Sequence, residues 1–428
     1  MNSLFAEKIY QRDDVFGLSR DIPLNYVERE GVDGKFNACI RTNKHVVIYG
    51  SSKQGKTCLR KHCLATDDYI MVQCTNNLDL AGLNSSILKR AGFELTQSTT
   101  KTTSGKMKAS ALFKGRLIGI EISAGGEKEN TGELKIVSQP MEIDLEDVND
   151  IIAALKSINF DKIIVLEDFH YLTPESQKSF SFTLKAFHET SPYIFVIVGV
   201  WLEDNKLIIY NGDLTGRVVS VNADTWSKEE LEKVISDGAA LLGVSFDPNF
   251  VDQVVEGSRG SIYIVQEACR RACAKDGVNA TVANNPTVGA GLAARQLIKE
   301  IVDEQSARYN AFITGLSEGF QDTELEMFKW MLYPILSENI DEISSGILYR
   351  SFRTVLREKH PRGHDLNPGN ITQALNSISS LQVKKDIKPI VVDYDQTQKK
   401  LNFVDRGFLL WLAHQDINEI KEDVGINV

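Results

Sequence analysis

The residues best suited to chemistry lie in one short stretch, residues 45–57. Its sequence, HVVIYGSSKQGKT, fits the pattern G-x-x-x-x-G-K-[ST] of a phosphate-binding loop, with a β-branched apolar run before it and a helical segment after it. The two glycines let the backbone wrap closely around phosphates, so that successive N–H groups point at them. The helix that follows adds the positive end of its dipole. This stretch therefore predicts a site for a nucleoside triphosphate.

The residue types in this loop indicate individual roles. Lys56 places an ammonium group on the β- and γ-phosphates, and the hydroxyl of Thr57 ligates Mg²⁺. ATP and Mg²⁺ are therefore the expected cofactors. The loop residues that we expect to contact the nucleotide are Gly50, Ser51, Ser52, Lys53, Gln54, Gly55, Lys56, Thr57 and Cys58.

An acidic pair, Glu167 and Asp168, follows a buried strand predicted over residues 162–166. Phosphate-loop ATPases need a carboxylate at that strand end to hold Mg²⁺, and usually a second one to orient the attacking water. The usual order is Asp then Glu, and here it is reversed. We assign Glu167 to the metal and Asp168 to the water, with a shift by one residue as the alternative. The shorter carboxylate in the water position predicts slow hydrolysis.

Two arginines could reach the phosphates from other parts of the chain. Arg217 follows the strand predicted over 193–199, where an arginine can stabilise transition-state charge on the γ-phosphate of its own or a neighbouring subunit. Arg259 opens a predicted lid helix and could sense the nucleotide from the other side. An ordinary surface position is the alternative for both arginines.

Alternating apolar strands and amphipathic helices must position these residues. This alternation indicates a parallel sheet covered by helices on both faces. The buried strands are predicted at residues 45–49, 68–74, 162–166 and 193–199. The expected fold class is therefore α/β, with the phosphate loop at the end of the first strand.

Helices dominate the chain from residue 223 onward. A capping box at Ser227 opens the first of them, and a Gly- and Asn-rich boundary ends this lid region. Beyond it we expect one long helix, three shorter helices and two strands, which is the winged-helix pattern. The predicted helices cover 292–313, 323–333, 345–358 and 368–381. The predicted domains are an ATPase core over 1–222, a helical lid over 223–288 and a winged-helix domain over 289–428.

The alternation of predicted strands and helices is interrupted over residues 96–142. Two alternating runs, 110–123 and 131–143, predict an inserted β-hairpin. Residues 101–116 hold five basic side chains and no acidic one, although the chain has a net charge of −10. The five are Lys101, Lys106, Lys108, Lys114 and Arg116. This insert could be an arm that meets DNA phosphates or an acidic partner, or a surface loop kept soluble by its lysines.

The composition is that of a globular protein. Hydrophobic residues make up 42% of the 428 residues and charged residues 25%, and the net charge of −10 argues against general coating of nucleic acid. The six cysteines lack disulfide-framework or zinc spacing. There is no signal-peptide pattern and no apolar run long enough for a membrane span. We therefore expect a cytoplasmic protein without membrane contact.

The phosphate loop, the acidic pair, Arg217 and the helical lid resemble the AAA+ and STAND-type ATPases. The segment Tyr26 to Glu30 resembles the one that lines the adenine pocket in that superfamily, with Glu28 in place of the usual Gly. This resemblance adds Val27 and Arg29 to the expected nucleotide contacts. The layout YVER, YGSSKQGKT and LEDFHYL looks closer still to bacterial ATP-binding proteins of mobile and phage-defence loci.

Two features depart from the superfamily pattern. No polar sensor residue follows the strand that ends at Gly199, and Arg259 sits one place away from the usual lid motif. The combination of core, lid and winged helix otherwise resembles the origin-initiator ATPases and the STAND switches.

The resemblance implies three alternative functions. The first is an ATP-binding, slowly hydrolysing switch that forms homo-oligomers with nucleotide and controls a partner effector, as in phage defence. The second is an ATPase that assembles on DNA through the insert at 101–116 or the winged helix, like initiators and transposition regulators. The third is a nucleotide-bound scaffold.

The last predicted helix favours the switch, because a helix that reads bases usually brings Arg or Lys. Its outward side chains are polar but uncharged, namely Thr372, Gln373, Asn376, Ser379 and Ser380. Basic residues gather instead before it, at Arg350, Arg353, Arg357, Lys359 and Arg362.

Overall fold

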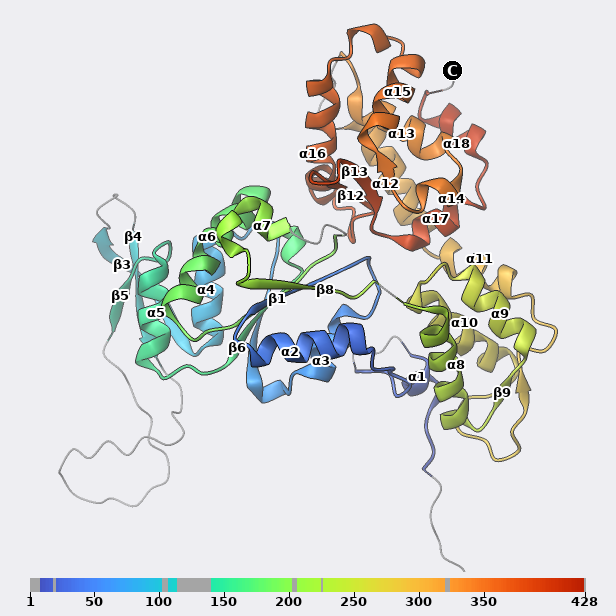
Figure 1. Ribbon diagram of the computed structural model, residues 1–428, viewed down its shortest axis with the longest axis horizontal. Coiled ribbons are helices and arrows are strands. Elements are labelled where there is room, and N and C mark those ends of the chain that lie inside the picture. The colour runs from blue at the N-terminus through green and yellow to red at the C-terminus, as the bar shows by residue number, and fades with distance from the viewer. Residues whose placement is uncertain are drawn as a thin grey trace, which may run out of the picture.

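The chain forms a core, a helical lid and a C-terminal lobe (Figure 1). We call residues up to 224 the core, residues 226–303 the lid and residues 306–426 the C-terminal lobe. The computed structural model describes residues 8–17, 21–101, 107–113, 140–201, 206–224, 226–319 and 324–426. No helix among these described residues is long and apolar enough to cross a membrane.

A parallel five-stranded sheet forms the centre of the core, in the order β2-β6-β7-β1-β8. Its strands are β1 (His45–Tyr49), β2 (Tyr69–Gln73), β6 (Ile163–Glu167), β7 (Phe195–Val198) and β8 (Val218–Asn222). β1 and β7 are buried along their whole length, as their continuous apolar runs predict. The predicted α/β fold with a parallel sheet is therefore confirmed.

Helices cover both faces of this sheet. One face packs on α2 (Lys35–Arg41) and α3 (Lys56–Cys63), and the other packs on α4 (Leu80–Arg90), α5 (Val148–Ser157) and α6 (Pro174–Thr190). Asp79, Asp147 and Thr173 each accept a backbone N–H at the start of the last three helices, which fixes where those helices begin. Two shorter elements complete this side, the turn η3 (Phe169–Tyr171) and α7 (Lys206–Tyr210).

The inserted segment forms a three-stranded antiparallel sheet at one end of the core. Its strands are β3 (Phe93–Lys101), β4 (Met107–Phe113) and β5 (Met141–Ile143), in the order β3-β4-β5. β4 pairs with β5 through Ser110 and Glu142, which belong to the two predicted runs, whereas residues 114–139 of the predicted hairpin lie outside the described residues. The sequence analysis missed β3, whose threonines suit a strand as well as a loop. Lys106, Lys114 and Arg116 lie outside the described residues.

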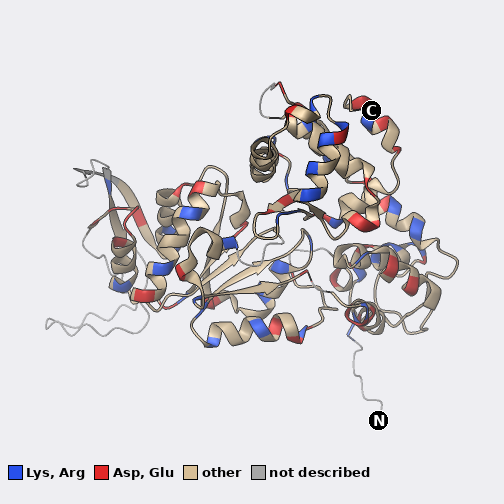
Figure 2. Ribbon diagram, turned by 45° about the horizontal axis from the view of Figure 1, so that its top comes forward, with Lys and Arg blue, Asp and Glu red and all other residues tan. Residues whose placement is uncertain are grey.

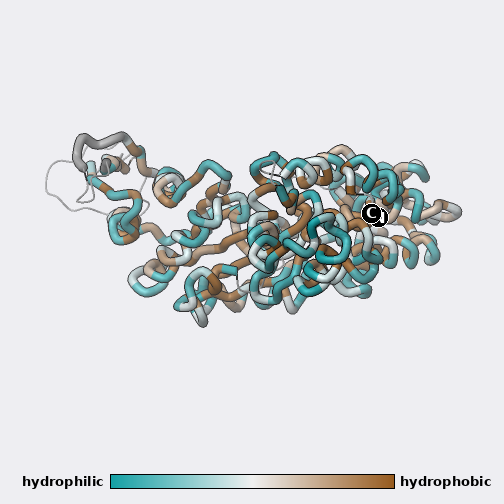
Figure 3. The backbone as a smooth tube through the Cα atoms, turned by 90° about the horizontal axis from the view of Figure 1, so that it is seen from above, coloured by the Kyte–Doolittle hydropathy of each residue, from teal (hydrophilic) through white to brown (hydrophobic). Residues whose placement is uncertain are grey.

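The lid consists of α8 (Lys228–Leu242), α9 (Pro248–Gly257), α10 (Ile262–Lys275) and α11 (Ala294–Asp303), with a short pair β9 (Ser245–Phe246) and β10 (Thr287–Val288). The N-terminal helix α1 (Arg12–Val15) packs on α8 and α10. The predicted capping box is present, because Ser227 and Glu230 satisfy each other's backbone N–H groups. Figure 3 shows hydrophobic stretches of the chain (brown) along the strands of the central sheet.

The single helix predicted over 292–313 is wrong. The chain instead forms α11 and then α12 (Ser306–Glu318), with a break at Glu304 and Gln305. α11 contacts α9 and α10 of the lid and also α17 of the C-terminal lobe, whereas α12 contacts α13 and α16 of that lobe. The break lets the two helices turn their apolar faces toward these different sets of partners.

The C-terminal lobe is a helical bundle with a small antiparallel sheet in the order β11-β13-β12. Its remaining helices are α13 (Met327–Ser337), α14 (Ile340–Ile343), α15 (Tyr349–Lys359), α16 (Pro368–Lys384), α17 (Arg406–Leu412) and α18 (Ile417–Asp423). Its strands are β11 (Ile347–Leu348), β12 (Val392–Asp395) and β13 (Lys400–Phe403). The predicted helices at 345–358 and 368–381 correspond to α15 and α16, and the winged-helix assignment stays a prediction.

Candidate nucleotide site

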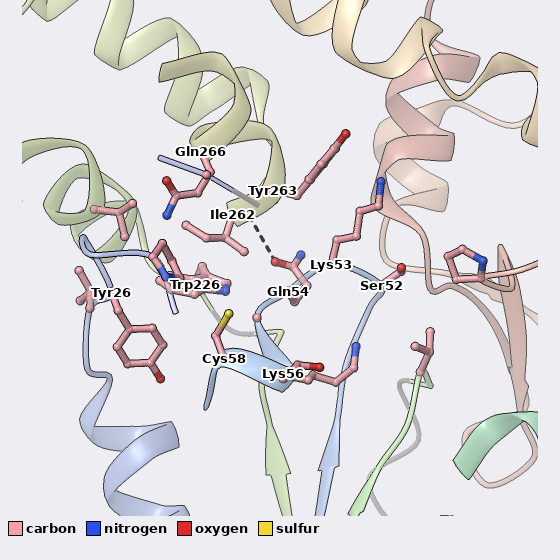
Figure 4. Close-up of a pocket in the computed structure, with 18 of the residues that line it drawn as sticks. Tyr26, Ser52, Lys53, Gln54, Lys56, Cys58, Trp226, Ile262, Tyr263 and Gln266 are labelled. Atoms are coloured by element: carbon pink, nitrogen blue, oxygen red, sulfur yellow. Dashed lines mark hydrogen bonds between the residues drawn. The ribbon is translucent and has the colours of Figure 1, made fainter. Parts of the chain in front are cut away.

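A cavity of about 480 Å³ lies between the core and the lid, at the carboxyl ends of the central strands. Residues 52–58 of the phosphate loop form its floor, and Ile262, Tyr263 and Gln266 of α10 face them from the lid (Figure 4). Asp168, which follows β6, lines the same cavity. The geometry therefore joins the loop and one of the two predicted carboxylates in a single site.

The phosphate loop has the backbone that its glycines predict. Gly55 adopts a φ of 82°, in the left-handed region, immediately before α3 begins at Lys56. Gly50 has a φ of 140°, and a Cβ at this position would lie 3.0 Å from the backbone N of Asp224. Glycine is therefore required at residue 50 by both conformation and space.

Lys56 is folded back onto its own loop. Its Nζ donates to the carbonyl oxygens of Gly50 at 3.0 Å and Ser51 at 2.5 Å. Burial lowers the pKa of this ammonium to about 8, against the opposing attraction of Asp224, Asp168 and Glu167. The lysine is thus buried in the cavity wall with weakened basicity, which an anionic ligand would reverse.

Asp224 is a site residue that the sequence analysis missed. Its carboxylate accepts hydrogen bonds from the backbone N of Ser51 at 3.2 Å and from the Ser51 hydroxyl at 3.0 Å. It also forms an ion pair with Arg406 of the C-terminal lobe, at 2.8 Å. Asp224 comes two residues after β8, at the sheet edge where the loop lies, and that position was the available signal.

The C-terminal lobe lies directly on the phosphate loop. The backbone N–H of Ser52 donates to the carbonyl oxygen of Val404 at 2.7 Å. Nearby, Lys53 Nζ donates to Gln305 Oε1 at 3.1 Å, and Arg406 Nη1 donates to the carbonyl oxygen of Arg259 at 2.7 Å. The lobe therefore contacts the loop directly through the main chain of Val404, and Gln305 and Arg259 lie beside this junction.

The two acidic residues after β6 face different partners. Glu167 is buried and forms an ion pair with Arg60 of α3 at 2.6 Å, and it does not line the nucleotide cavity. Asp168 has a φ of 56°, accepts a hydrogen bond from Gln73 Nε2 at 2.5 Å and lines the cavity. Burial raises the pKa of both carboxyls above the ordinary value. Their predicted roles stay a prediction, and the geometry favours the alternative in which Asp168 serves the metal.

The far end of the cavity is apolar and aromatic. Val27 and Arg29 line it as predicted, together with Tyr26 and Trp226 (Figure 4). The Arg29 guanidinium lies 3.9 Å from the centroid of a Trp226 ring, and Arg29 Nη1 donates to the carbonyl oxygen of Ala223 at 3.0 Å. Trp226, which the sequence analysis missed, offers a flat surface for a nucleobase.

A pair of buried amides also lines this end. Asn25 Nδ2 donates to Gln266 Oε1 at 3.1 Å, and Gln266 Nε2 donates back to Asn25 Oδ1 at 2.9 Å. Asn25 Nδ2 also donates to the carbonyl oxygen of Val234. These contacts tie the N-terminal segment to α8 and α10, and sequence patterns gave no signal for them because the two amides are far apart in the chain.

The two predicted arginines lie away from the cavity. Arg217 pairs with Glu189 at 2.8 Å and donates to the carbonyl oxygen of Asp213. Arg259 pairs with Asp341 of the C-terminal lobe at 2.6 Å. Neither lines the cavity, so a role for either one on the phosphates of its own subunit finds no support, and a role for Arg217 across a subunit interface stays a prediction.

The donor set of the cavity suits Mg²⁺ bound together with phosphates. The hydroxyl of Thr57 and the carboxylate of Asp168 are hard oxygen ligands, and both residues line the cavity. Within the described part of the chain, no three His, Cys, Asp or Glu side chains are placed to hold a metal by themselves. A metal here would therefore depend on oxygen atoms from the nucleotide, which is usual for Mg²⁺ in such sites.

Comparisons with known proteins support the fold. The chain matches no protein-family model and no curated protein. Solved structures of similar fold include a Walker-type ATPase of Pyrococcus abyssi, at 11% identity over 93% of this chain and 99% of that chain, with a TM-score of 0.50. Another is the Orc1 protein of Aeropyrum pernix in complex with DNA, at 12% identity over 98% of each chain, with a TM-score of 0.42. The RuvB Holliday junction branch migration motor of Thermotoga maritima follows at 10% identity over 94% of this chain and 96% of that chain, with a TM-score of 0.36.

Proposed function

We propose that the chain is an ATP-binding, slowly hydrolysing switch in which the nucleotide and the C-terminal lobe compete for the phosphate loop. The observation that carries this proposal is the 2.7 Å hydrogen bond from the Ser52 N–H to the Val404 carbonyl oxygen. N–H groups of such a loop are the donors that hold phosphates. A carbonyl of the lobe takes one of these donors here, so phosphate oxygens and the docked lobe need the same group.

The charges around the loop support the same competition. Asp224 accepts two hydrogen bonds from Ser51 and also forms an ion pair with Arg406 of the lobe. Phosphates entering beside Lys56 bring several negative charges close to Asp224 and would displace its carboxylate from Ser51. The ion pair between Asp224 and Arg406 would then weaken, and the lobe would be released from the loop.

The chemistry of hydrolysis rests on a few cavity residues. In this proposal Lys56 binds the β- and γ-phosphates, Thr57 holds Mg²⁺, and Asp168 is the carboxylate that faces the metal and the attacking water. Glu167 stays paired with Arg60, so it acts on the metal only if that ion pair opens. One carboxylate in place of the usual two agrees with slow turnover.

Assembly and partners extend this proposal. We propose an ATPase core over 1–222, a helical lid over 223–288 and a winged-helix domain over 289–428. We also propose nucleotide-dependent homo-oligomers and a partner effector controlled by the released lobe, as in phage-defence ATPases of the STAND type. Arg217 is exposed enough to meet a second copy, since its side chain is 32% exposed.

A specific observation supports DNA binding as a second candidate function. Arg350, Arg353 and Arg357 recur on one face of α15, and no ion pair among the described residues includes any of them. Figure 2 shows Lys and Arg positions (blue) along the helices of the C-terminal lobe. Such a stripe suits phosphates of a nucleic acid. Changing all three to Ala should reduce the salt dependence of DNA binding by about three units if each one contacts a phosphate. Absence of DNA binding by the wild-type chain would remove this candidate.

The competition is tested with Arg406→Ala. Loss of the ion pair with Asp224 weakens the docked lobe, so ATP should bind about three to ten times more tightly, within the range for a partly exposed ion pair. Hydrogen exchange of residues 400–412 should rise when ATP is added to the wild type and should already be high in the variant. Arg362→Ala is the matched control, because Arg362 pairs with Glu324 and Asp365 within the same lobe.

Two outcomes would contradict the switch. One is ATP binding that leaves exchange over residues 400–412 unchanged, and the other is equal ATP affinity in Arg406→Ala and wild type. The chain would be better described as a nucleotide-bound scaffold if it binds ATP without hydrolysing it and if Asp168→Asn leaves its ATP affinity unchanged.

A further inference from the structure

The turn between α9 and α10 connects three parts of the molecule, and we call its residues 258–261 the lid turn. The carbonyl oxygen of Gly260 accepts a hydrogen bond from Gln54 Nε2 of the phosphate loop at 3.2 Å. The preceding carbonyl oxygen, that of Arg259, accepts one from Arg406 Nη1 of the C-terminal lobe at 2.7 Å. Two successive carbonyl groups of the lid are therefore bound by the core and by the lobe.

The lid turn has a defined backbone geometry. Arg259 adopts a φ of 48° and Gly260 a φ of 77°, both in the left-handed region. This conformation is costly for a residue other than glycine, and it persists where the surrounding structure fixes it. A Cβ at Gly260 would lie 3.3 Å from Arg406 Nη1, so glycine also leaves space for the arginine of the lobe.

Gln54 caps the lid helix α10 from outside the lid. α10 begins at Ile262, and its N-cap residue, Ser261, makes no side-chain cap hydrogen bond. The first N–H groups of a helix have no partner within the helix. Here the backbone N of Ile262 donates to Gln54 Oε1 at 3.3 Å (Figure 4). The side chain of Gln54 is fully buried, and its single amide group binds both the lid turn and the start of α10.

The neighbouring loop residue, Lys53, makes a further contact with α10. Its Nζ lies 3.9 Å from the centroid of the Tyr263 ring, which is the geometry of a cation–π interaction. Two successive residues of the phosphate loop therefore contact the first turn of α10. Both hydrogen bonds of Gln54 are longer than the usual distance of about 2.9–3.0 Å. They can therefore shorten when the loop and the lid move together.

We infer that Gln54 is a positioning residue through which phosphates in the loop fix the lid over the nucleotide cavity. Phosphates order the backbone N–H groups that surround them, and Gln54 lies within this backbone, directly before Gly55. Because both ends of its amide are bonded to the lid, ordering of the loop also orders the start of α10. This inference rests on the proposed function, in which the loop binds phosphates, and it adds the contact by which the lid responds.

Hydrogen exchange on the full chain with tripolyphosphate tests this inference, because this ligand has no base that could touch α10. Calorimetry first establishes a saturating concentration for each variant. In the wild type, tripolyphosphate should slow the exchange of residues 263–267 by about threefold or more. In Gln54→Leu, these residues should exchange about five times faster in the free protein, as for the loss of an ordinary hydrogen bond. Tripolyphosphate should no longer change that rate.

A second variant, Ile262→Pro, removes the same contact from the side of the lid and leaves the phosphate loop intact. Proline is well tolerated at the first position of a helix. Ser261 already has the extended backbone that a residue before proline prefers, with a φ of −86° and a ψ of 105°. Exchange of residues 263–267 in this variant should also be insensitive to tripolyphosphate.

Gln177→Leu is the matched control, because Gln177 is another buried glutamine whose amide donates to a main-chain carbonyl, that of Leu172 at 2.9 Å. This hydrogen bond stays within the core, so the variant should respond to tripolyphosphate like the wild type. Slow exchange of β1 in every variant reports that the core is folded.

The inference is wrong if tripolyphosphate binds the wild type and leaves the exchange of residues 263–267 unchanged. It is also wrong if both Gln54→Leu and Ile262→Pro respond as the wild type does. A wild-type chain that does not bind tripolyphosphate would contradict the proposed function itself, and this inference with it.

Discussion

The two ends of the nucleotide cavity differ in the kind of surface that they offer to a ligand. At the phosphate end, Lys56 donates to carbonyl oxygens of its loop and the Ser52 N–H donates to Val404 of the C-terminal lobe. At the base end, Trp226 and Val27 present apolar surface, while the polar groups of Asn25, Gln266, Tyr26 and Arg29 bond to other parts of the protein. A nucleotide therefore exchanges contacts at the phosphate end but adds them at the base end. We therefore expect phosphate binding to change the position of the C-terminal lobe, and base binding to add affinity for the nucleotide.

The largest expected effect is at the phosphate end. Lys56→Ala removes the ammonium that meets the β- and γ-phosphates, so ATP affinity should fall by about a hundredfold or more, as for loss of a strong charge-assisted contact. Calorimetry with ATP and with inorganic tripolyphosphate should show the same loss for both ligands. Lys35→Ala, on the exposed surface of α2, is the control. Wild-type affinity in Lys56→Ala would show that the phosphates bind elsewhere.

A smaller effect is expected at the base end. Trp226→Ala should weaken ATP about tenfold, since stacking of a base on an aromatic ring is worth about 1–3 kcal/mol. Tripolyphosphate, which has no base, should bind the variant as it binds the wild type, and Trp226→Phe should keep most of the affinity for ATP. An equal loss for ATP and tripolyphosphate would mean that Trp226 supports the loop and does not contact the base.

The smallest expected effect is a dependence on pH. Burial lowers the pKa of Lys56 to about 8 in the free protein, so its ammonium loses its proton as the pH rises through that value. ATP needs the charged form, so its affinity should be constant below about pH 7 and fall about fourfold between pH 7 and 8.5, from the fraction still protonated. Calorimetry in buffers of different ionisation enthalpy should show proton uptake on binding at pH 8.5. Lys56→Arg, which does not titrate in this range, should bind with no such uptake.

Local signals in the sequence were enough for the phosphate loop and for four strands of the central sheet, whereas β8 was not predicted as a strand. The run before Gly50 is continuous and β-branched, and β1 is buried along its whole length between two parallel neighbours. The capping residues Thr173, Ser227 and Asn367 each lie at the start of a helix, because a cap depends only on residues three or four positions away. Features that depend only on residues a few positions apart in the chain can be predicted from sequence alone.

Features that depend on distant segments could not be predicted in this way. Asp224 and Arg406 meet across 182 positions, and Asn25 and Gln266 across 241. Arg60 looks like an ordinary helix residue in the sequence, yet it neutralises the carboxylate assigned to the metal. The break between α11 and α12 likewise involves distant segments, since α11 packs on α9, α10 and α17 whereas α12 packs on α13 and α16.

The contact between Ser52 and Val404 joins two main-chain groups, and this has a consequence for how the protein can change during evolution. Substitutions at residue 404 that keep the backbone path leave its carbonyl in place, so the side chain there can drift without releasing the lobe. A selection for variants whose C-terminal lobe stays detached from the phosphate loop should therefore seldom yield substitutions at residue 404. It should recover changes at Arg406 and Asp224, whose side chains hold the same junction.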